Sequence, residues 1–91
     1  MIRSFRHKGL RDLFVANDVA GLRPDLAERC RPRLSALDAA TRPEDLNLPG
    51  FRFHALRGRP KRYAIAVNGP WRITFEWQGG DAWRVDLEQY H

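Results

Sequence analysis

The sequence predicts an α+β domain in which two N-terminal helices pack on one face of a twisted, mostly antiparallel sheet. Two patterns support this prediction. Apolar residues recur at helical spacing before residue 41, and they alternate with polar residues after Gly50. A chain of 91 residues has room for one modest core, so we expect residues 1–91 to form a single domain.

Two helices are expected before the sheet. The first is indicated by apolar residues at i, i+3 and i+4, namely Leu10, Leu13 and Phe14. The second is expected to begin at Pro24, because proline is favoured in the first helical turn, and to end near Ala40. Pro32 lies inside this helix and removes one backbone hydrogen bond, which predicts a bend near Arg29.

Four stretches after residue 50 alternate with period two, the pattern of strands that bury one face. Turn sequences at 68–70 and 78–81 separate the last three stretches at hairpin spacing. The expected inward positions are Phe51, Phe53, Tyr63, Ile65, Val67, Trp71, Ile73, Phe75, Trp77, Trp83, Val85 and Leu87. The expected outward positions include Arg52, His54, Arg72, Thr74 and Arg84, with Arg57 close by. The sequence therefore predicts a cationic sheet face opposite the helices.

The excess basic charge is concentrated in one segment. The chain has 16 Lys and Arg residues against 11 Asp and Glu, a net charge of +5. Residues 46–75 contain six of the basic residues and no acidic residue, so this segment carries +6 and the remainder −1. The six are Arg52, Arg57, Arg59, Lys61, Arg62 and Arg72. Segregated positive charge favours a polyanionic partner, with nucleic acid as the first candidate, over a merely solvated face.

Composition and motifs argue against several other classes. No apolar run approaches the roughly 20 residues of a membrane span, and no apolar stretch follows the basic N-terminus, so neither a transmembrane protein nor a signal peptide is expected. The single cysteine, Cys30, permits no internal disulfide and lies on the apolar stripe of the second helix, as a core residue would. The three histidines lack metal-site spacing, and no glycine motif for nucleotide phosphates is present. A cytoplasmic protein without metal or cofactor is expected.

A set of His, Arg and Tyr residues fits cleavage of RNA through its own 2′-hydroxyl. This reaction needs a group that accepts the hydroxyl proton, a group that stabilises charge on the phosphorane, and a group that protonates the leaving 5′-oxygen. His and Tyr can transfer protons, and Arg offers a planar fork of donors to phosphate oxygens. The candidates are His54, Arg57, Arg72, Tyr90 and His91.

Each of these residues also has an interpretation without chemistry. His54 could be an ordinary surface histidine, and Arg72 could stack on the adjacent Trp71 and stay solvated. Tyr90 could be a core residue of the last strand. The residues alone therefore leave two classes open: an RNA-cleaving enzyme, and a non-catalytic RNA- or ribosome-binding protein whose arginines contact only the phosphate backbone.

Five segments, in this order, resemble the HigB toxins (host-inhibition-of-growth killer proteins) of the RelE/ParE superfamily. They are His54-Ala55-Leu56-Arg57-Gly58, Ala64-Ile65-Ala66-Val67, Trp71-Arg72-Ile73-Thr74-Phe75, Gly80-Asp81-Ala82 and Tyr90-His91. Met1-Ile2-Arg3-Ser4-Phe5 and Leu37-Asp38-Ala39-Ala40-Thr41 are also similar to that family, so the resemblance covers essentially the whole chain.

The resemblance implies the RelE-like fold and the toxin of a type II toxin–antitoxin pair. Toxins of this kind are ribosome-dependent mRNA endoribonucleases, which cut mRNA in the A site of the 70S ribosome by metal-free attack of the 2′-hydroxyl. The implied partners are a HigA-like helix-turn-helix antitoxin, the ribosome and mRNA, with operator DNA bound only through the antitoxin complex. A ParE-like toxin, which poisons DNA gyrase on the same scaffold without catalytic histidines, is the alternative within the superfamily.

Carried over by position, the resemblance implies proton transfer by His54 and His91, orientation or assistance by Tyr90, and a phosphate contact by Arg72. The basic residues expected to bind RNA are Arg52, Arg57, Arg59, Lys61, Arg62 and Arg84. Two positions depart from the family pattern: Gln89 replaces an acidic residue, and Asn68 replaces a basic residue near a turn. Because an amide cannot act as a carboxylate base, His91 becomes the expected base.

Overall fold

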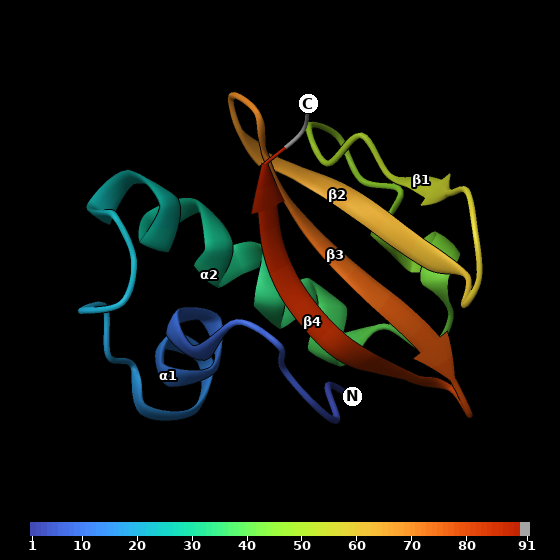
Figure 1. Cartoon of the computed structure of the whole chain (residues 1–91), viewed down its shortest axis with the longest axis horizontal. Helices are drawn as coiled ribbons and strands as arrows, with labels where there is room; N and C mark the ends of the chain where they lie inside the picture. The colour runs from blue at the N-terminus through green and yellow to red at the C-terminus, as the bar shows by residue number, and fades with distance from the viewer. Residues whose placement is uncertain (90–91) are drawn as a thin grey trace.

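In the computed structural model, which describes residues 1–89, two helices precede a four-stranded antiparallel sheet (Figure 1). The elements are α1 (Lys8–Ala16), α2 (Pro24–Ala39), the short 3-10 helix η1 (Pro43–Leu46), β1 (His54–Leu56), β2 (Arg62–Asn68), β3 (Trp71–Gln78) and β4 (Asp81–Gln89). The strands pair in chain order, β1-β2-β3-β4. The predicted α+β fold class is confirmed. Tyr90 and His91, two of the predicted site residues, lie outside the described residues.

Both predicted helices form, and the second begins at Pro24, as predicted. The His7 side chain caps α1 by accepting a hydrogen bond from the Leu10 N–H at 3.1 Å. α1 is followed by Asn17, which takes the left-handed conformation that commonly ends a helix, with a φ of 55°. α2 starts at Pro24 and continues past Pro32, so the internal proline does not end it.

The core lies between the two helices and one face of the sheet (Figure 1). Its main buried side chains are Leu10, Leu13, Leu26, Cys30, Leu34, Leu37, Leu46, Ile65, Val67, Ile73, Phe75, Val85 and Leu87. Burial raises the pKa of the Cys30 thiol to about 11, which keeps the thiol protonated at neutral pH. Cys30 is therefore a core residue, as predicted.

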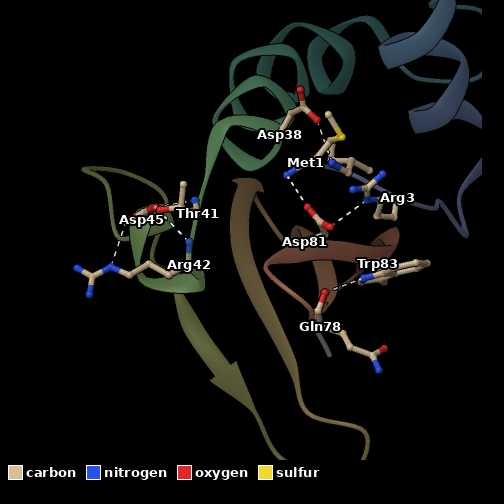
Figure 2. Close-up of polar contacts among 10 residues, drawn as sticks. Met1, Arg3, Asp38, Thr41, Arg42, Asp45, Gln78, Asp81 and Trp83 are labelled. Carbon is tan, nitrogen blue, oxygen red and sulfur yellow. Dashed lines mark hydrogen bonds and ion pairs between the residues drawn. The ribbon is translucent and has the colours of Figure 1, made fainter.

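Residues before α1 run along β4 and cover that edge of the sheet. They form two isolated parallel bridges, Ile2 with Ala82 and Phe5 with Val85. Figure 2 shows the polar contacts near the start of this segment: the N-terminal ammonium and the Arg3 guanidinium both contact Asp81, at 3.3 and 2.9 Å. The Ile2 N–H donates to Asp38 of α2 at 2.9 Å. Covering an edge strand in this way satisfies backbone groups that would otherwise be open to pairing.

The predicted inward position of Trp83 is wrong. A β-bulge in β4, where Arg84 takes a left-handed φ of 51°, shifts the register with β3 by one residue. One extra residue inverts the alternation of side chains along the strand. Trp83 consequently pairs with Glu76 on the outer face and is 37% exposed, while Ala82 takes the inward position and is fully buried.

The strand predicted to start at Phe51 starts at His54. Arg52 takes a left-handed φ of 50°, which interrupts the regular extended conformation before β1. Phe51 still lies beside β2, because its carbonyl accepts a hydrogen bond from the Ala66 N–H at 2.6 Å. Phe51 and Phe53 are half-buried against the core, so their inward direction is confirmed although the strand is shorter.

Candidate active site

The outer face of the sheet, opposite the helices, carries an open cleft of about 440 Å³. Its lining residues are Arg52, His54, Ala66, Gly69, Pro70, Trp71 and Arg72. They come from β1 and the segment before it, from β2 and β3, and from the turn between these two strands. The structure therefore brings three predicted site residues, Arg52, His54 and Arg72, to one place.

Strand pairing explains why these residues meet. His54 pairs with Ala64 across β1 and β2, and Ala66 pairs with Arg72 across β2 and β3. Paired residues point to the same face of a sheet, so all four lie on the outer face. Between His54 and Arg72 the central strand β2 presents only the short side chains of alanine. The cleft forms there because alanine leaves space between the longer side chains on either side.

His54 is exposed at the edge of this cleft. Its Nδ1 lies 2.9 Å from the Arg52 carbonyl oxygen. A carbonyl oxygen can only accept a hydrogen bond, so Nδ1 must carry the proton in this contact. In the neutral imidazole, Nε2 is then the unprotonated nitrogen and can accept a proton from a bound molecule.

Arg72 lies between β2 and β4 on the same face, where it pairs with Ala66 on one side and Glu88 on the other. Its side chain is half-buried, and its Nε atom is buried. Partial burial restricts the rotamers of a long side chain before any ligand binds, which reduces the entropy cost of binding. The guanidinium fork is suited to a phosphate group in the cleft.

A polar cluster of Arg62, Thr74 and Glu88 lies beside Arg72. Arg62 Nη1 donates to Glu88 Oε2 at 2.8 Å, and the Thr74 hydroxyl donates a short hydrogen bond to the same oxygen. Thr74 was predicted to face outward and does, yet it is fully buried within this cluster. Burial raises the pKa of Glu88, but the hydrogen bonds from Thr74 and Arg62 and the nearby positive charges outweigh it, so the net pKa is lowered. Glu88 is therefore ionised at neutral pH.

The other predicted RNA-binding residues do not line the cleft. The exposed loop between β1 and β2 carries Arg57, Arg59 and Lys61. Arg62 forms an ion pair with Glu88. Arg84 lies in the β4 bulge, and its Nε is 3.6 Å from Glu76 Oε2. Of the predicted site residues that the structure describes, only the three named above line the cleft.

One wall of the cleft is fixed by contacts that the sequence analysis did not identify. The Asn68 side chain, at the end of β2, donates to Asp25 Oδ2 at 3.1 Å, and Arg23 contacts the same oxygen at 2.9 Å. The hydrogen bond from Arg23 is the main cause that lowers the pKa of Asp25 to about 2. The Arg23 guanidinium also lies 5.9 Å from the centre of the Trp71 ring. These contacts tie the turn between β2 and β3 to the first turn of α2, although Asn68 and Asp25 are 43 residues apart in the sequence.

The chemistry available at the cleft is proton transfer by an imidazole and anion binding by guanidinium groups. Within residues 1–89, His, Cys, Asp and Glu side chains form no group of three or more that could hold a metal ion. In the same part of the chain, no helix is long and apolar enough to cross a membrane.

Comparison with known proteins shows the family of this chain. The model of the HigB-like toxins, described as RelE-like toxins of the type II toxin–antitoxin system HigB, matches residues 3–91. The chain is 40% identical over 92 aligned residues to Endoribonuclease HigB of Proteus vulgaris, with all of both chains covered. It is 33% identical to Toxin HigB-1 of Vibrio cholerae serotype O1, with 99% of this chain and 98% of that protein covered. This chain belongs to the HigB-like toxin family.

Membership of the HigB-like toxins confirms the resemblance found in the sequence, and it gives the chain an antitoxin as partner. The two departures from the family pattern now have structural positions. Asn68 contributes the contact with Asp25 that fixes the cleft wall. Gln89 pairs with Trp71, whereas Glu88 pairs with Arg72, so the acidic side chain near the end of this HigB-like toxin lies on the face that carries the cleft.

Proposed function

We propose that this HigB-like toxin is an endoribonuclease that cuts mRNA in the ribosomal A site and thereby inhibits translation. The observation that carries the proposal is the cleft in which an exposed imidazole and a half-buried guanidinium, His54 and Arg72, share one sheet face. The Proteus vulgaris relative, which matches over its whole length, is named an endoribonuclease.

In the proposed reaction a base removes the 2′-hydroxyl proton, O2′ attacks the adjacent phosphorus, and the bond from phosphorus to O5′ breaks. The leaving O5′ takes up a proton, so the products are a 2′,3′-cyclic phosphate and a 5′-hydroxyl end. His54, through Nε2, and His91 are the proposed proton-transfer residues, and Tyr90 orients the substrate or assists. Arg72 stabilises the charge that develops on the phosphorane.

Basic residues around the cleft are proposed to bind the RNA backbone. The exposed ones are Arg52, Arg57, Arg59 and Lys61. Arg62 and Arg84 add positive charge to the same face, but acidic partners offset part of their attraction for phosphate. We therefore propose that the first four contribute more to RNA affinity than Arg62 and Arg84 do.

The proposed partners are the 70S ribosome with its mRNA and a HigA-like helix-turn-helix antitoxin. Operator DNA is proposed to bind only through the complex of toxin and antitoxin. The ribosome and mRNA place the proposed site of action in the cytoplasm.

Mapping of mRNA 5′ ends after brief induction of the toxin tests this function. We expect cuts inside translated codons with the natural chain and at least about 100-fold fewer with Arg72→Ala, because loss of a group that stabilises transition-state charge costs roughly that much. Arg29→Ala, which removes the same charge from an exposed position on α2, is the matched control and should cut normally.

Other outcomes would point to other functions. DNA breaks with intact mRNA would indicate a gyrase poison, and RNA binding without cut ends would indicate a non-catalytic ribosome-binding protein. Purified toxin should cut a message on translating ribosomes and leave the same message intact without them. Equal cutting of free and ribosome-bound message would refute action in the A site.

A further inference from the structure

A carboxylate lies beside Arg72 on the face that carries the cleft. Glu88 pairs with Arg72 across β3 and β4, and Gln89 pairs with Trp71. Because side chains alternate along a strand, Glu88, and not Gln89, points to the face of the proposed site. Although position 89 is an amide, the face of the proposed site still carries a carboxylate, that of Glu88.

Glu88 is fixed in place by two donors. Arg62 reaches from β2 across β3 to donate to Glu88 Oε2 at 2.8 Å, and the Thr74 hydroxyl donates to the same oxygen. Thr74 is fully buried, and the Glu88 side chain is only 30% exposed. Hydrogen bonds to an ionised group in a partly desolvated setting are stronger than neutral ones, so the carboxylate is held rigidly.

The fixed carboxylate also balances charge on this face. Arg62 and Arg72 extend from neighbouring strands onto the same surface, where two guanidinium groups would repel each other. Glu88 attracts both, and their positive charges contribute to the lowering of its pKa. The same attraction that favours the ionised form of Glu88 also favours a position of the Arg72 guanidinium close to the Glu88 carboxylate.

We propose that Glu88 is a positioning residue for Arg72: its carboxylate, fixed by Arg62 and Thr74, holds the Arg72 guanidinium in the orientation that receives the scissile phosphate. The inference rests on the proposed endoribonuclease function. Glu88 itself transfers no proton in this scheme, because a carboxylate that already accepts two hydrogen bonds and has a lowered pKa is a weak base.

Glu88→Gln tests the inference, since it keeps the length and an accepting oxygen of the side chain and removes its charge. Single-turnover cleavage of ribosome-bound mRNA should slow by about 10- to 100-fold, the loss expected when a phosphate-binding group is misplaced. Asp86→Asn is the matched control, because it removes one negative charge from the same face of β4, where Asp86 pairs with Thr74 and accepts a hydrogen bond from the Leu87 N–H. Its rate should stay within about twofold of the natural chain.

A second measurement separates positioning from loss of structure. In an Arg72→Lys background, Glu88→Gln should slow cleavage by less than about twofold, because the guanidinium on which it acts is already gone. Its effect on the thermal unfolding midpoint should be the same in both backgrounds. A merely structural Glu88 would instead slow cleavage equally in both.

Two results would overturn the inference alone: a natural chain that cuts RNA while Glu88→Gln cuts equally fast, or equal losses in the two backgrounds. A natural chain that cuts no RNA on translating ribosomes would overturn the proposed function, and the inference with it.

Discussion

Arg33 connects α2 to the segment that carries Arg52 and His54. Its Nε donates to the Ala66 carbonyl at 2.6 Å, and its guanidinium lies 4.8 Å from the centre of the Phe51 ring. Arg33→Ala removes both contacts and leaves a half-buried carbonyl without its charged donor. Because Ala66 lines the cleft and Phe51 directly precedes Arg52, the substitution should reduce both stability and the order of the cleft.

The size of the effect of Arg33→Ala follows from these two contacts. A hydrogen bond from a charged donor contributes about 1.5–3 kcal/mol, and the cation–π contact about 0.5–1 kcal/mol. Burial lowers the pKa of Arg33, which means that the guanidinium has lost hydration and that part of the gain is offset. We therefore expect a net loss of about 2 kcal/mol, which for a chain of this size lowers Tm by roughly 8–16 °C.

Thermal and urea unfolding followed by circular dichroism measure this loss. Arg33→Lys keeps the charge but not the guanidinium fork, so its stability should be intermediate. Arg29→Ala, one helical turn earlier and exposed, should stay within about 0.5 kcal/mol of the natural chain. If Arg33→Ala proves as stable as Arg29→Ala, the contacts with Ala66 and Phe51 do not hold the cleft segment and the reasoning is refuted.

Three further substitutions test other parts of the structure. Asp25→Asn should reduce the loss of thermal stability at acid pH. In the folded protein the pKa of Asp25 is about 2, below the ordinary 3.8. The stability that ionised Asp25 contributes is therefore complete above about pH 4 and is lost as the pH falls through 2. A fall of the unfolding midpoint at acid pH identical to that of the natural chain would contradict this. Gly9→Ala should cost about 1–3 kcal/mol in urea unfolding, because the added Cβ would lie 2.6 Å from the Gly21 carbonyl oxygen. A more stable variant would mean that helix propensity outweighs this close approach. Trp83→Ala should lower thermal stability by less than about 2 kcal/mol, and a loss of the roughly 3–5 kcal/mol typical of a buried tryptophan would contradict its outward position.

The fold class could be predicted because hydrophobic periodicity is a property of whole segments. The helical spacing of Leu10 and Leu13 and the alternation of Ile65 and Val67 can be recognised even where single neighbouring residues depart from the pattern. The errors arose where the backbone leaves the regular conformation. The late start of β1 and the outward turn of Trp83 follow from positive φ angles at Arg52 and Arg84. Positive φ is unusual for arginine, so neither residue type signals it.

Only the part of the candidate site that depends on local alternation could be predicted from the sequence. His54 and Arg72 could be assigned to one face from alternation alone, and in the structure both line the same cleft. The contacts that shape the cleft depend on residues far apart in the chain. Arg62 and Glu88 are 26 positions apart, and the strand order that joins them is a tertiary property.

Charge along the sequence also differs from charge across the surface. The segment 46–75 contains no acidic residue, yet the outer face of the sheet does, because β3 and β4 add Glu76, Asp86 and Glu88 to it. The exposed cations Arg52 and Arg57 lie at the opposite side of the sheet, in or next to β1. A uniformly basic face would attract a polyanion equally over its whole surface, whereas on this face acidic partners offset part of the charge of Arg62 and Arg84. The distribution of charge on the folded face therefore cannot be read from the sequence segment alone, because the order of the strands decides which acidic side chains lie beside which cations.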